Sequence, residues 1–182
     1  MRTDRQVPAT DPLAGRRVLV LISGSIAAVK LPSLVSALVH RGALVRCVLS
    51  PAASRLVSPV ALASLSRHPC HLDEDQWSHR AARPLHVELA EWADLVLLAP
   101  LSATTLGRWV QGLADSLLAS VLLAGEAPVL VAPAMNTAMW DAPAVRRNWL
   151  ELQSWERVLP LAPGSGLLAC DRVGEGRMAE PD

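Results

Sequence analysis

The sequence predicts a single α/β domain in which a parallel β-sheet carries helices on both of its faces. The chain of 182 residues has the length of one ordinary domain. Short apolar runs rich in Val and Leu recur along it with the length of buried strands, and stretches with apolar residues at helical spacing separate them. This alternation is typical of a doubly wound parallel sheet, which binds ligands at the carboxyl ends of its strands.

The first half of the chain is expected to form a right-handed βαβ unit and the start of the next helix. Residues 17–22 are apolar on both faces and too short for a helix, so they predict the first strand. A Ser-Gly-Ser turn and a helix over 26–40 follow, and Pro32 should bend this helix early. Residues 44–49 predict the second strand, and a further helix is expected from about Ala52.

The second half continues the alternation after a long loop at 67–83, in which at most a short strand is expected. The later elements are predicted as a helix at 85–93, a strand at 95–99, helices between 106 and 123, a strand at 129–132, a helix at 138–152 and a short strand at 158–159. The Gly-rich stretch 164–176 is expected to form neither helix nor strand and to be a mobile lid. The whole is a Rossmann-like, flavodoxin-like arrangement.

Composition limits the partners of this domain. Hydrophobic residues make up 51% of the chain and charged residues 19%, with a mean hydropathy of +0.29, so an extensive subunit interface is expected. No apolar run reaches the roughly 18–20 residues that span a bilayer. Seventeen basic and 17 acidic residues cancel without forming blocks, so neither nucleic acid nor a membrane is an expected partner.

Residues 1–14 lack the apolar core of a signal peptide and predict a flexible lead-in to a cytoplasmic domain. The three cysteines are odd in number and widely spaced, which favours reduced thiols over a disulfide framework or a zinc site.

Small hydroxyl-bearing residues follow three of the predicted strands. They are Ser23 and Ser25 around Gly24, then Ser50, and then Ser102 with Thr104 and Thr105. At one edge of a parallel sheet such groups and free backbone N–H groups are able to bind a phosphate, although capping of the following helices explains them equally well. The first turn lacks the G-x-G-x-x-G spacing and no acidic residue ends the second strand, which favours a mononucleotide over a nicotinamide dinucleotide.

Three further residues are candidates for chemistry. Asn136 follows a strand, where its amide either holds a carboxylate or a flavin edge, or caps the next helix. His86 stands near a helix start and serves as an acid or base, or is structural. Cys170 lies in the Gly-rich stretch, as part of a lid or as an incidental thiol. Local patterns leave each alternative open.

Together these segments resemble the homo-oligomeric flavin-containing Cys decarboxylase family over nearly the whole chain. The most specific match is the motif Pro-x-Met-Asn-x-x-Met-Trp, complete at 133–140. The motif His-x-x-Leu at 86–89, the turn Gly-Ser-Ile-Ala at 24–27 and Ala-Pro-Leu-Ser-Ala at 99–103 support it.

The resemblance implies that residues 15–182 form an FMN-binding domain, with a substrate clamp at about 164–181, in a homotrimer or higher homo-oligomer. It implies that FMN lies between subunits and contacts Gly24, Ser25, Ile26, Ser50, Ser102, Ala103, Thr104, Thr105, Ala134 and Met135. The implied substrate is a small molecule with a C-terminal cysteine carboxylate, bound by Asn136, Met139, Ala169, Arg177 and Met178. His86, Asn136 and Cys170 are the implied catalytic residues.

The resemblance also implies the reaction. The substrate thiol is oxidised to a thioaldehyde, CO2 is lost, and an enethiol remains. In the coenzyme A branch of the family the clamp cysteine, here Cys170, then donates a proton as the enethiol is reduced, so that 4′-phosphopantothenoylcysteine becomes 4′-phosphopantetheine. Peptidyl-cysteine decarboxylases lack that cysteine and release the enethiol.

This chain departs from the family at the clamp, which usually reads Ala-Cys-Gly-Asp. Here Asp171 and Arg172 follow Cys170, so a glycine free to adopt a positive φ is replaced by Asp. Thr104 and Arg108 stand where the family usually has Asn and Lys. A peptidyl-cysteine decarboxylase, a non-catalytic FMN-binding regulator and a flavin prenyltransferase-like protein are the alternatives, and the last is disfavoured by the motif at 133–140.

Overall fold

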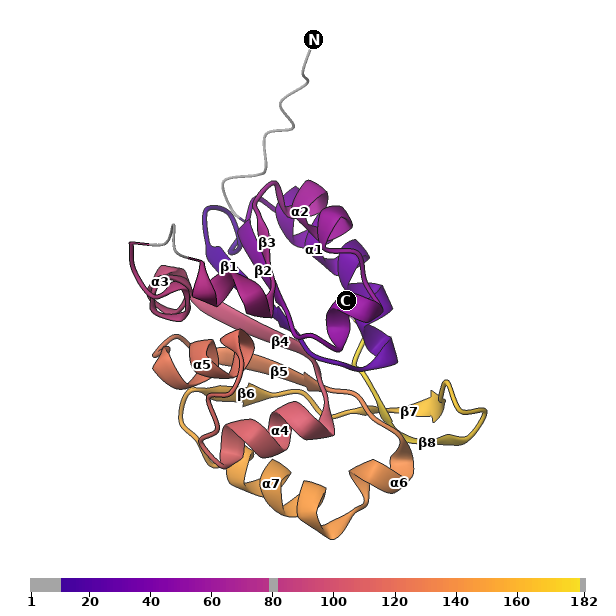
Figure 1. Ribbon diagram of the computed structural model, residues 1–182. Helices are drawn as coiled ribbons and strands as arrows, with labels where there is room; N and C mark the ends of the chain where they lie inside the picture. The colour runs from indigo at the N-terminus through magenta and orange to yellow at the C-terminus, as the bar shows by residue number, and fades with distance from the viewer. Residues whose placement is uncertain (1–10, 79–81, 181–182) are drawn as a thin grey trace.

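The computed structural model describes residues 11–78 and 82–180, and these contain the predicted parallel sheet (Figure 1). Its strands lie in the order β3-β2-β1-β4-β5-β6, and every neighbouring pair is parallel. This is the strand order of the Rossmann fold, which confirms the predicted fold class. The strands are β1 (Arg17–Ile22), β2 (Leu44–Leu49), β3 (Cys70–His71), β4 (Leu95–Leu101), β5 (Val129–Pro133) and β6 (Val158–Pro160).

Helices cover both faces of the sheet. They are η1 (Ile26–Lys30), α1 (Leu31–His40), η2 (Ala53–Arg55), α2 (Pro59–Ser66), η3 (Asp73–Trp77), α3 (Leu85–Trp92), α4 (Ala103–Val110), α5 (Leu117–Ala124), α6 (Thr137–Trp140) and α7 (Pro143–Gln153). Alternate side chains of β1 enter two cores. Leu19 and Leu21 pack with α3, α4, α5 and α7, while Val20 and Ile22 pack with η1, α1 and α2.

Prolines divide two of the predicted helices. Pro32 stands in the first turn of α1, after the separate 3-10 turn η1, and Pro143 stands in the first turn of α7, after the short α6. Proline is tolerated in a first turn, where its missing N–H leaves no bond unmade. The helix expected from Ala52 begins later, because Ser58 caps α2 by accepting the N–H of Ala61.

The prediction that the Gly-rich stretch forms no strand is wrong. An antiparallel hairpin of β7 (Gly164–Leu167) and β8 (Val173–Arg177) occupies it and projects beside α6 (Figure 1). The glycines of β8 let its backbone lie close to the segment before α6. The sequence pattern of hydrophobic side chains does not reveal such a strand.

The two ends of the chain are described only in part. Residues 1–10 of the predicted lead-in and Pro181 of the predicted clamp lie outside the described residues. Residues 11–14 form a turn, in which the N–H of Ala14 donates to the carbonyl of Asp11 over 3.0 Å. The carboxylate of Asp11 also pairs with Arg41 at 3.0 Å.

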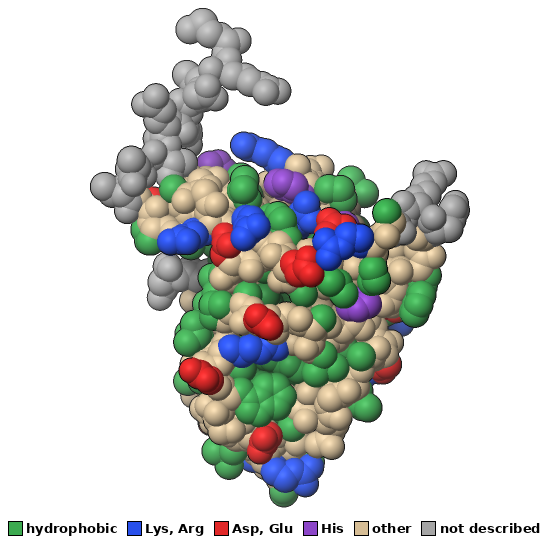
Figure 2. Space-filling model, turned by 90° about the vertical axis from the view of Figure 1, so that its left-hand side faces the viewer, with side chains coloured by type: hydrophobic (Ala, Val, Ile, Leu, Met, Phe, Trp, Pro, Cys, Tyr) green, Lys and Arg blue, Asp and Glu red, His purple; other side chains and the backbone are tan. Residues whose placement is uncertain are grey.

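Apolar side chains remain at the surface of this single chain. On the face that α1 and α2 cover, Ile26, Val29 and Leu159 are 55%, 54% and 49% exposed. On the side where α3 and α5 lie, hydrophobic side chains are interspersed with charged ones (Figure 2). The expected subunit interface stays a prediction. No helix of the described residues is long and apolar enough to cross a bilayer.

Candidate functional site

The carboxyl ends of β1 and β4 are tied together by one buried hydroxyl. Ser23 Oγ donates to the carbonyl of Pro100 over 2.7 Å and accepts the N–H of Ser102 over 2.8 Å. The chain leaves these two neighbouring strands in opposite directions, so they flank the topological switch point at which doubly wound sheets bind ligands. Ser23 therefore fixes the two turns that would flank a ligand.

The turn after β1 keeps a free hydroxyl and a bare backbone. A Cβ on Gly24 would lie 2.4 Å from the Cβ of Ala52, so only glycine fits there. Ser25 precedes η1 without making a side-chain cap hydrogen bond, which leaves its hydroxyl available to a ligand. The hydroxyl of Ser50 accepts the N–H of Ala53 over 3.2 Å, and its own proton is still available to a ligand. Of the predicted phosphate contacts in these turns, Ser25 and Ser50 both retain a hydroxyl donor.

The turn after β4 offers a second set of donors. Ser102 caps α4 by accepting the N–H of Thr105 over 3.3 Å, and its hydroxyl donates to Thr105 Oγ1 over 3.2 Å. Thr105 is buried and acts through Ser102, whereas Thr104 is exposed and Ala103 is partly exposed. The hydroxyls at the two turns and the N–H groups at the helix starts form a donor set that suits the phosphate of a mononucleotide.

The segment after β5 carries Asn136 with its amide held in one orientation. Asn136 Oδ1 accepts the N–H of Ala138 over 2.8 Å and so caps α6, while Nδ2 donates to the Sγ of Cys170 over 3.0 Å. The structure shows the helix cap, and the cap points the amide nitrogen at Cys170 in the hairpin. Binding of a carboxylate or a flavin edge by Asn136 stays a prediction. Ala134 is buried, and Met139 is 48% exposed beside the cap.

Strand β8 lies directly on this segment. The N–H of Met135 donates to the carbonyl of Gly176 over 2.9 Å, and Thr137 Oγ1 donates to the carbonyl of Glu175 over 2.7 Å. A Cβ on Gly176 would lie 2.3 Å from the carbonyl oxygen of Met135, and one on Gly174 would lie 2.3 Å from Thr137 Oγ1. The glycines therefore allow the contact that brings the hairpin onto Asn136.

The hairpin turns through residues 168–172, which hold Ala169 and Cys170 at the surface. The N–H of Asp171 donates to the carbonyl of Leu168 over 3.0 Å, and the N–H of Leu168 donates to the carbonyl of Arg172 over 2.8 Å. Asp171 adopts φ +60°. A β-turn followed by a left-handed residue is a common hairpin loop, and glycine is preferred at its last position.

Arg177 and Met178, at the end of β8, were both expected to bind substrate, but they differ in exposure. Arg177 is exposed, but Met178 is only 3% exposed and packs in the core beneath α1. Met178 thus supports the wall of the site from within.

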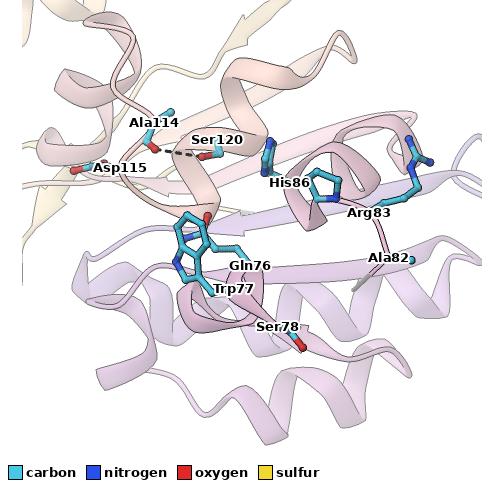
Figure 3. Close-up of a pocket in the computed structure, with 10 residues that line it drawn as sticks. Gln76, Trp77, Ser78, Ala82, Arg83, His86, Ala114, Asp115 and Ser120 are labelled. Carbon is cyan, nitrogen blue, oxygen red and sulfur yellow. Dashed lines mark hydrogen bonds between the residues drawn. The ribbon is translucent and has the colours of Figure 1, made fainter. Parts of the chain in front are cut away.

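His86 lies elsewhere on the chain. It lies in the first turn of α3 and lines a pocket of about 700 Å³ together with Trp77, Arg83, Asp115 and Ser120 (Figure 3). Neither Asn136 nor Cys170 lines this pocket, and α3 lies on the left of Figure 1 while α6 lies at the lower right. The structure therefore brings Asn136 and Cys170 together but leaves His86 apart from them within one chain.

Trp77 is a lining residue that the sequence analysis did not single out. Its side chain is 80% exposed on η3, and Figure 3 shows it facing the same space as His86. A tryptophan in an otherwise polar loop was the signal available, since large aromatic residues rarely remain exposed without a partner.

The other cysteines are remote from this chemistry. Cys47 and Cys70 face each other across β2 and β3, and burial raises the pKa of the Cys70 thiol to about 12 and that of Cys47 further. All three cysteines are free thiols. Within residues 11–78 and 82–180, no group of three His, Cys, Asp or Glu side chains is placed to hold a metal ion.

Known proteins match this chain over most of its length. The CoaBC bifunctional proteins of coenzyme A biosynthesis from Bacillus subtilis and Escherichia coli K12 are each 41% identical over 93% of the chain. The chain spans 41% of the length of these relatives.

Solved structures also match this chain over most of its length. A PPC decarboxylase mutant in complex with pantothenoylaminoethenethiol superimposes with a TM-score of 0.82 at 37% identity, covering 91% of this chain and 92% of that one. The FMN-dependent cysteine decarboxylase SpaF superimposes with a TM-score of 0.79 at 30% identity, covering 92% and 91%. A family model described as Flavoprotein matches residues 6–182. The chain therefore belongs to the Flavoprotein family, and within it to the homo-oligomeric flavin-containing Cys decarboxylase type.

Proposed function

We propose that this chain is an FMN-dependent decarboxylase that converts 4′-phosphopantothenoylcysteine to 4′-phosphopantetheine in coenzyme A biosynthesis. The observation that carries the proposal is the 3.0 Å contact between Asn136 Nδ2 and Cys170 Sγ. It joins a carboxylate-binding amide to a thiol that donates a proton, and the complete reaction needs both. Membership of the family supports FMN as the cofactor and decarboxylation as the reaction.

The chain's own donors would hold the cofactor. Ser25, Ser50 and Thr104, with the backbone N–H groups at the start of α4, would bind the phosphate of FMN. Ile26 and Met135 would contact the flavin ring, since both are at least partly exposed beside the switch point. Bound FMN would supply the two-electron redox chemistry, as the oxidant of the substrate's cysteine and then as the reductant of the enethiol.

Asn136 and Cys170 act on the substrate in succession. Asn136 Nδ2 holds the carboxylate of the thioaldehyde until the Cα–carboxylate bond breaks, CO2 leaves, and the electron pair passes through Cα and Cβ to the sulfur. Cys170 then donates its proton to Cα of the enethiol as Cβ is reduced, which yields the saturated thiol. The 3.0 Å contact between the two side chains supports this sequence, because it holds the proposed carboxylate donor next to the proposed proton source.

His86 enters the site from a second copy of the chain. Its pocket lies on the side of the molecule away from α6, so one chain does not supply all three residues to one substrate. A cyclic homotrimer, with His86 of one copy facing Asn136 of the next, completes the site, and the exposed apolar side chains of η1 and β6 provide surface for it. Free thiols at Cys47, Cys70 and Cys170 suit a reducing cytoplasm.

The decisive experiment is incubation of the FMN-loaded protein with 4′-phosphopantothenoylcysteine, followed by mass spectrometry. We expect loss of CO2 and a saturated thiol, and we expect Cys170→Ser to accumulate the enethiol. Release of enethiol alone by the unaltered protein supports a peptidyl-cysteine type of decarboxylase. No turnover by a yellow, FMN-loaded protein supports a regulatory flavoprotein and refutes the proposal.

Mixed oligomers test the shared site. His86→Asn and Asn136→Asp should each be inactive while retaining FMN. Coexpression of the two variants should restore about a quarter of the activity, because random assembly of a ring pairs the two intact residues at about one interface in four. Absence of any recovery in mixed oligomers, verified by mass spectrometry, would place all three residues within one chain.

A further inference from the structure

Two cations from separate elements converge on one carboxylate oxygen at the end of the clamp. Lys30 Nζ lies 2.6 Å and Arg177 Nη2 lies 2.5 Å from the same Oε1 of Glu180. The three side chains are 34%, 45% and 47% exposed, so solvent and ligands have access to them. Two positive charges share one negative charge, which leaves this cluster with a net charge of +1.

The cluster lies at the border of the substrate region. Lys30 ends η1, the turn that follows Gly24 and Ser25. Arg177 follows Gly176, whose carbonyl accepts the N–H of Met135 next to Asn136. The two cations therefore connect the turn after β1 with the segment that carries Asn136.

The geometry suits a phosphate monoester better than a carboxylate. A phosphate monoester carries about −1.5 to −2 charges and three acceptor oxygens, so it can satisfy an ammonium and a guanidinium at the same time. A single oxygen of Glu180 accepts from both cations, and the hydrogen bonds from Lys30 and Arg177 lower the pKa of this carboxyl. A dianion in its place would neutralise the cluster fully.

We propose that Lys30 and Arg177 form a subsite for the phosphate group of the substrate, and that Glu180 occupies this subsite until the substrate displaces it. The inference rests on the proposed function, since it assigns the far end of the same substrate. Eleven bonds join the cysteine Cα of 4′-phosphopantothenoylcysteine to its phosphorus atom, a span of up to about 13 Å. Arg177 directly follows Gly176, whose carbonyl accepts the N–H of Met135 next to Asn136, so the subsite and Asn136 belong to adjoining segments.

The alternative role for the cluster is a salt bridge that fastens the C-terminal segment to η1. Exposed pairs of this kind contribute little to stability, about 0–1 kcal/mol, and one cation is sufficient for them. A fastening role predicts equal effects on all ligands, whereas a phosphate subsite predicts an effect that depends on the phosphate.

Calorimetric titration of the FMN-loaded protein with 4′-phosphopantothenate and with pantothenate separates the two roles. We expect the phosphorylated probe to bind about tenfold more tightly or better, as two charge-assisted contacts allow. Lys30→Gln and Arg177→Gln should each remove most of this preference and leave pantothenate binding unchanged. Glu180→Gln should strengthen binding of the phosphorylated probe alone, because the competing carboxylate is gone. Arg147→Gln, at an exposed arginine of α7, is the control and should change neither probe.

Two results would overturn the inference: equal binding of both probes to the unaltered protein, or an equal loss of both probes in Lys30→Gln. These outcomes are independent of turnover. If the phosphate preference holds while 4′-phosphopantothenoylcysteine is not decarboxylated, the subsite stands and the proposed reaction fails. If decarboxylation occurs without a phosphate preference, the reaction stands and the subsite fails.

Discussion

The clamp turn contains a residue in an unfavourable backbone conformation, and replacing it should make the clamp close more firmly. Asp171 adopts φ +60°, where a side chain with a Cβ costs about 1–2 kcal/mol and Asp somewhat less. Asp171→Gly removes this cost but makes the open chain more flexible, so the net gain is about 0.5–1 kcal/mol. The closed hairpin should be favoured roughly two- to fivefold more than in the unaltered protein.

Amide hydrogen exchange measures this effect without any chemistry at the site. The N–H groups of Leu168 and Asp171 are bonded across the turn, at 2.8 and 3.0 Å, and both should exchange two- to fivefold more slowly in Asp171→Gly, an estimate that follows from the closed population. During turnover the firmer clamp should hold Cys170 against the enethiol for longer, so the proportion of released enethiol should fall.

Asp171→Ala is the matched control, because it also removes the carboxylate but keeps a Cβ and lacks a polar group that tolerates the left-handed region. It should exchange faster than the unaltered protein and release more enethiol. If Gly and Ala give the same exchange rates, the carboxylate rather than the backbone controls the clamp, and the reasoning is refuted.

Three further predictions concern the supports of the site. Gly174→Ala places a Cβ 2.3 Å from Thr137 Oγ1, so the hairpin should shift, and the product mixture should contain more enethiol by mass spectrometry at unchanged FMN content. Ser23→Ala leaves the part-buried N–H of Ser102 unpaired and removes one of the two hydrogen bonds to the carbonyl of Pro100, which should cost about 1–3 kcal/mol of unfolding free energy in a denaturant titration and weaken FMN binding. The hydrogen bonds from Arg17 hold the pKa of Asp94 at about 2, below its ordinary 3.8, so the stability they give is present above pH 4 and is lost as the pH falls towards 2. Thermal melts of Asp94→Asn should therefore fall less steeply than those of the unaltered protein over that pH range.

The regular part of the fold was predictable because buried strands of a parallel sheet have a distinctive sequence pattern. β1 and β2 begin and end where their apolar runs do, since both faces of these strands are covered. The pattern missed β7 and β8, whose pairing depends on glycines that approach backbone and hydroxyl atoms closely. Rules of local periodicity rely on alternating side chains, so they do not identify a strand whose pairing depends on glycines.

The sequence was sufficient to propose the residues of the candidate site, but it did not predict which of them contact one another. Local patterns could not choose between a cap and a ligand contact for Asn136, and the resemblance to a family supplied the choice of residues. The contact between Asn136 and Cys170 crosses 34 positions of sequence and depends on the unpredicted hairpin. Trp77 was missed because no motif marks it.

The helix cap that Asn136 makes would also serve its proposed chemical role, and two substitutions separate the two roles. Its Oδ1 caps α6 over 2.8 Å, and that bond forces Nδ2 toward Cys170. Asp is an equally good cap, so Asn136→Asp should keep the stability and the flavin content. It loses the N–H donor, however, and opposes the substrate carboxylate with a second negative charge, so decarboxylation should stop. Asn136→Ala should lose the cap as well, at about 1 kcal/mol of unfolding free energy, without restoring the donor. Decarboxylation by Asn136→Asp at the unaltered rate would show that this residue is a helix cap only.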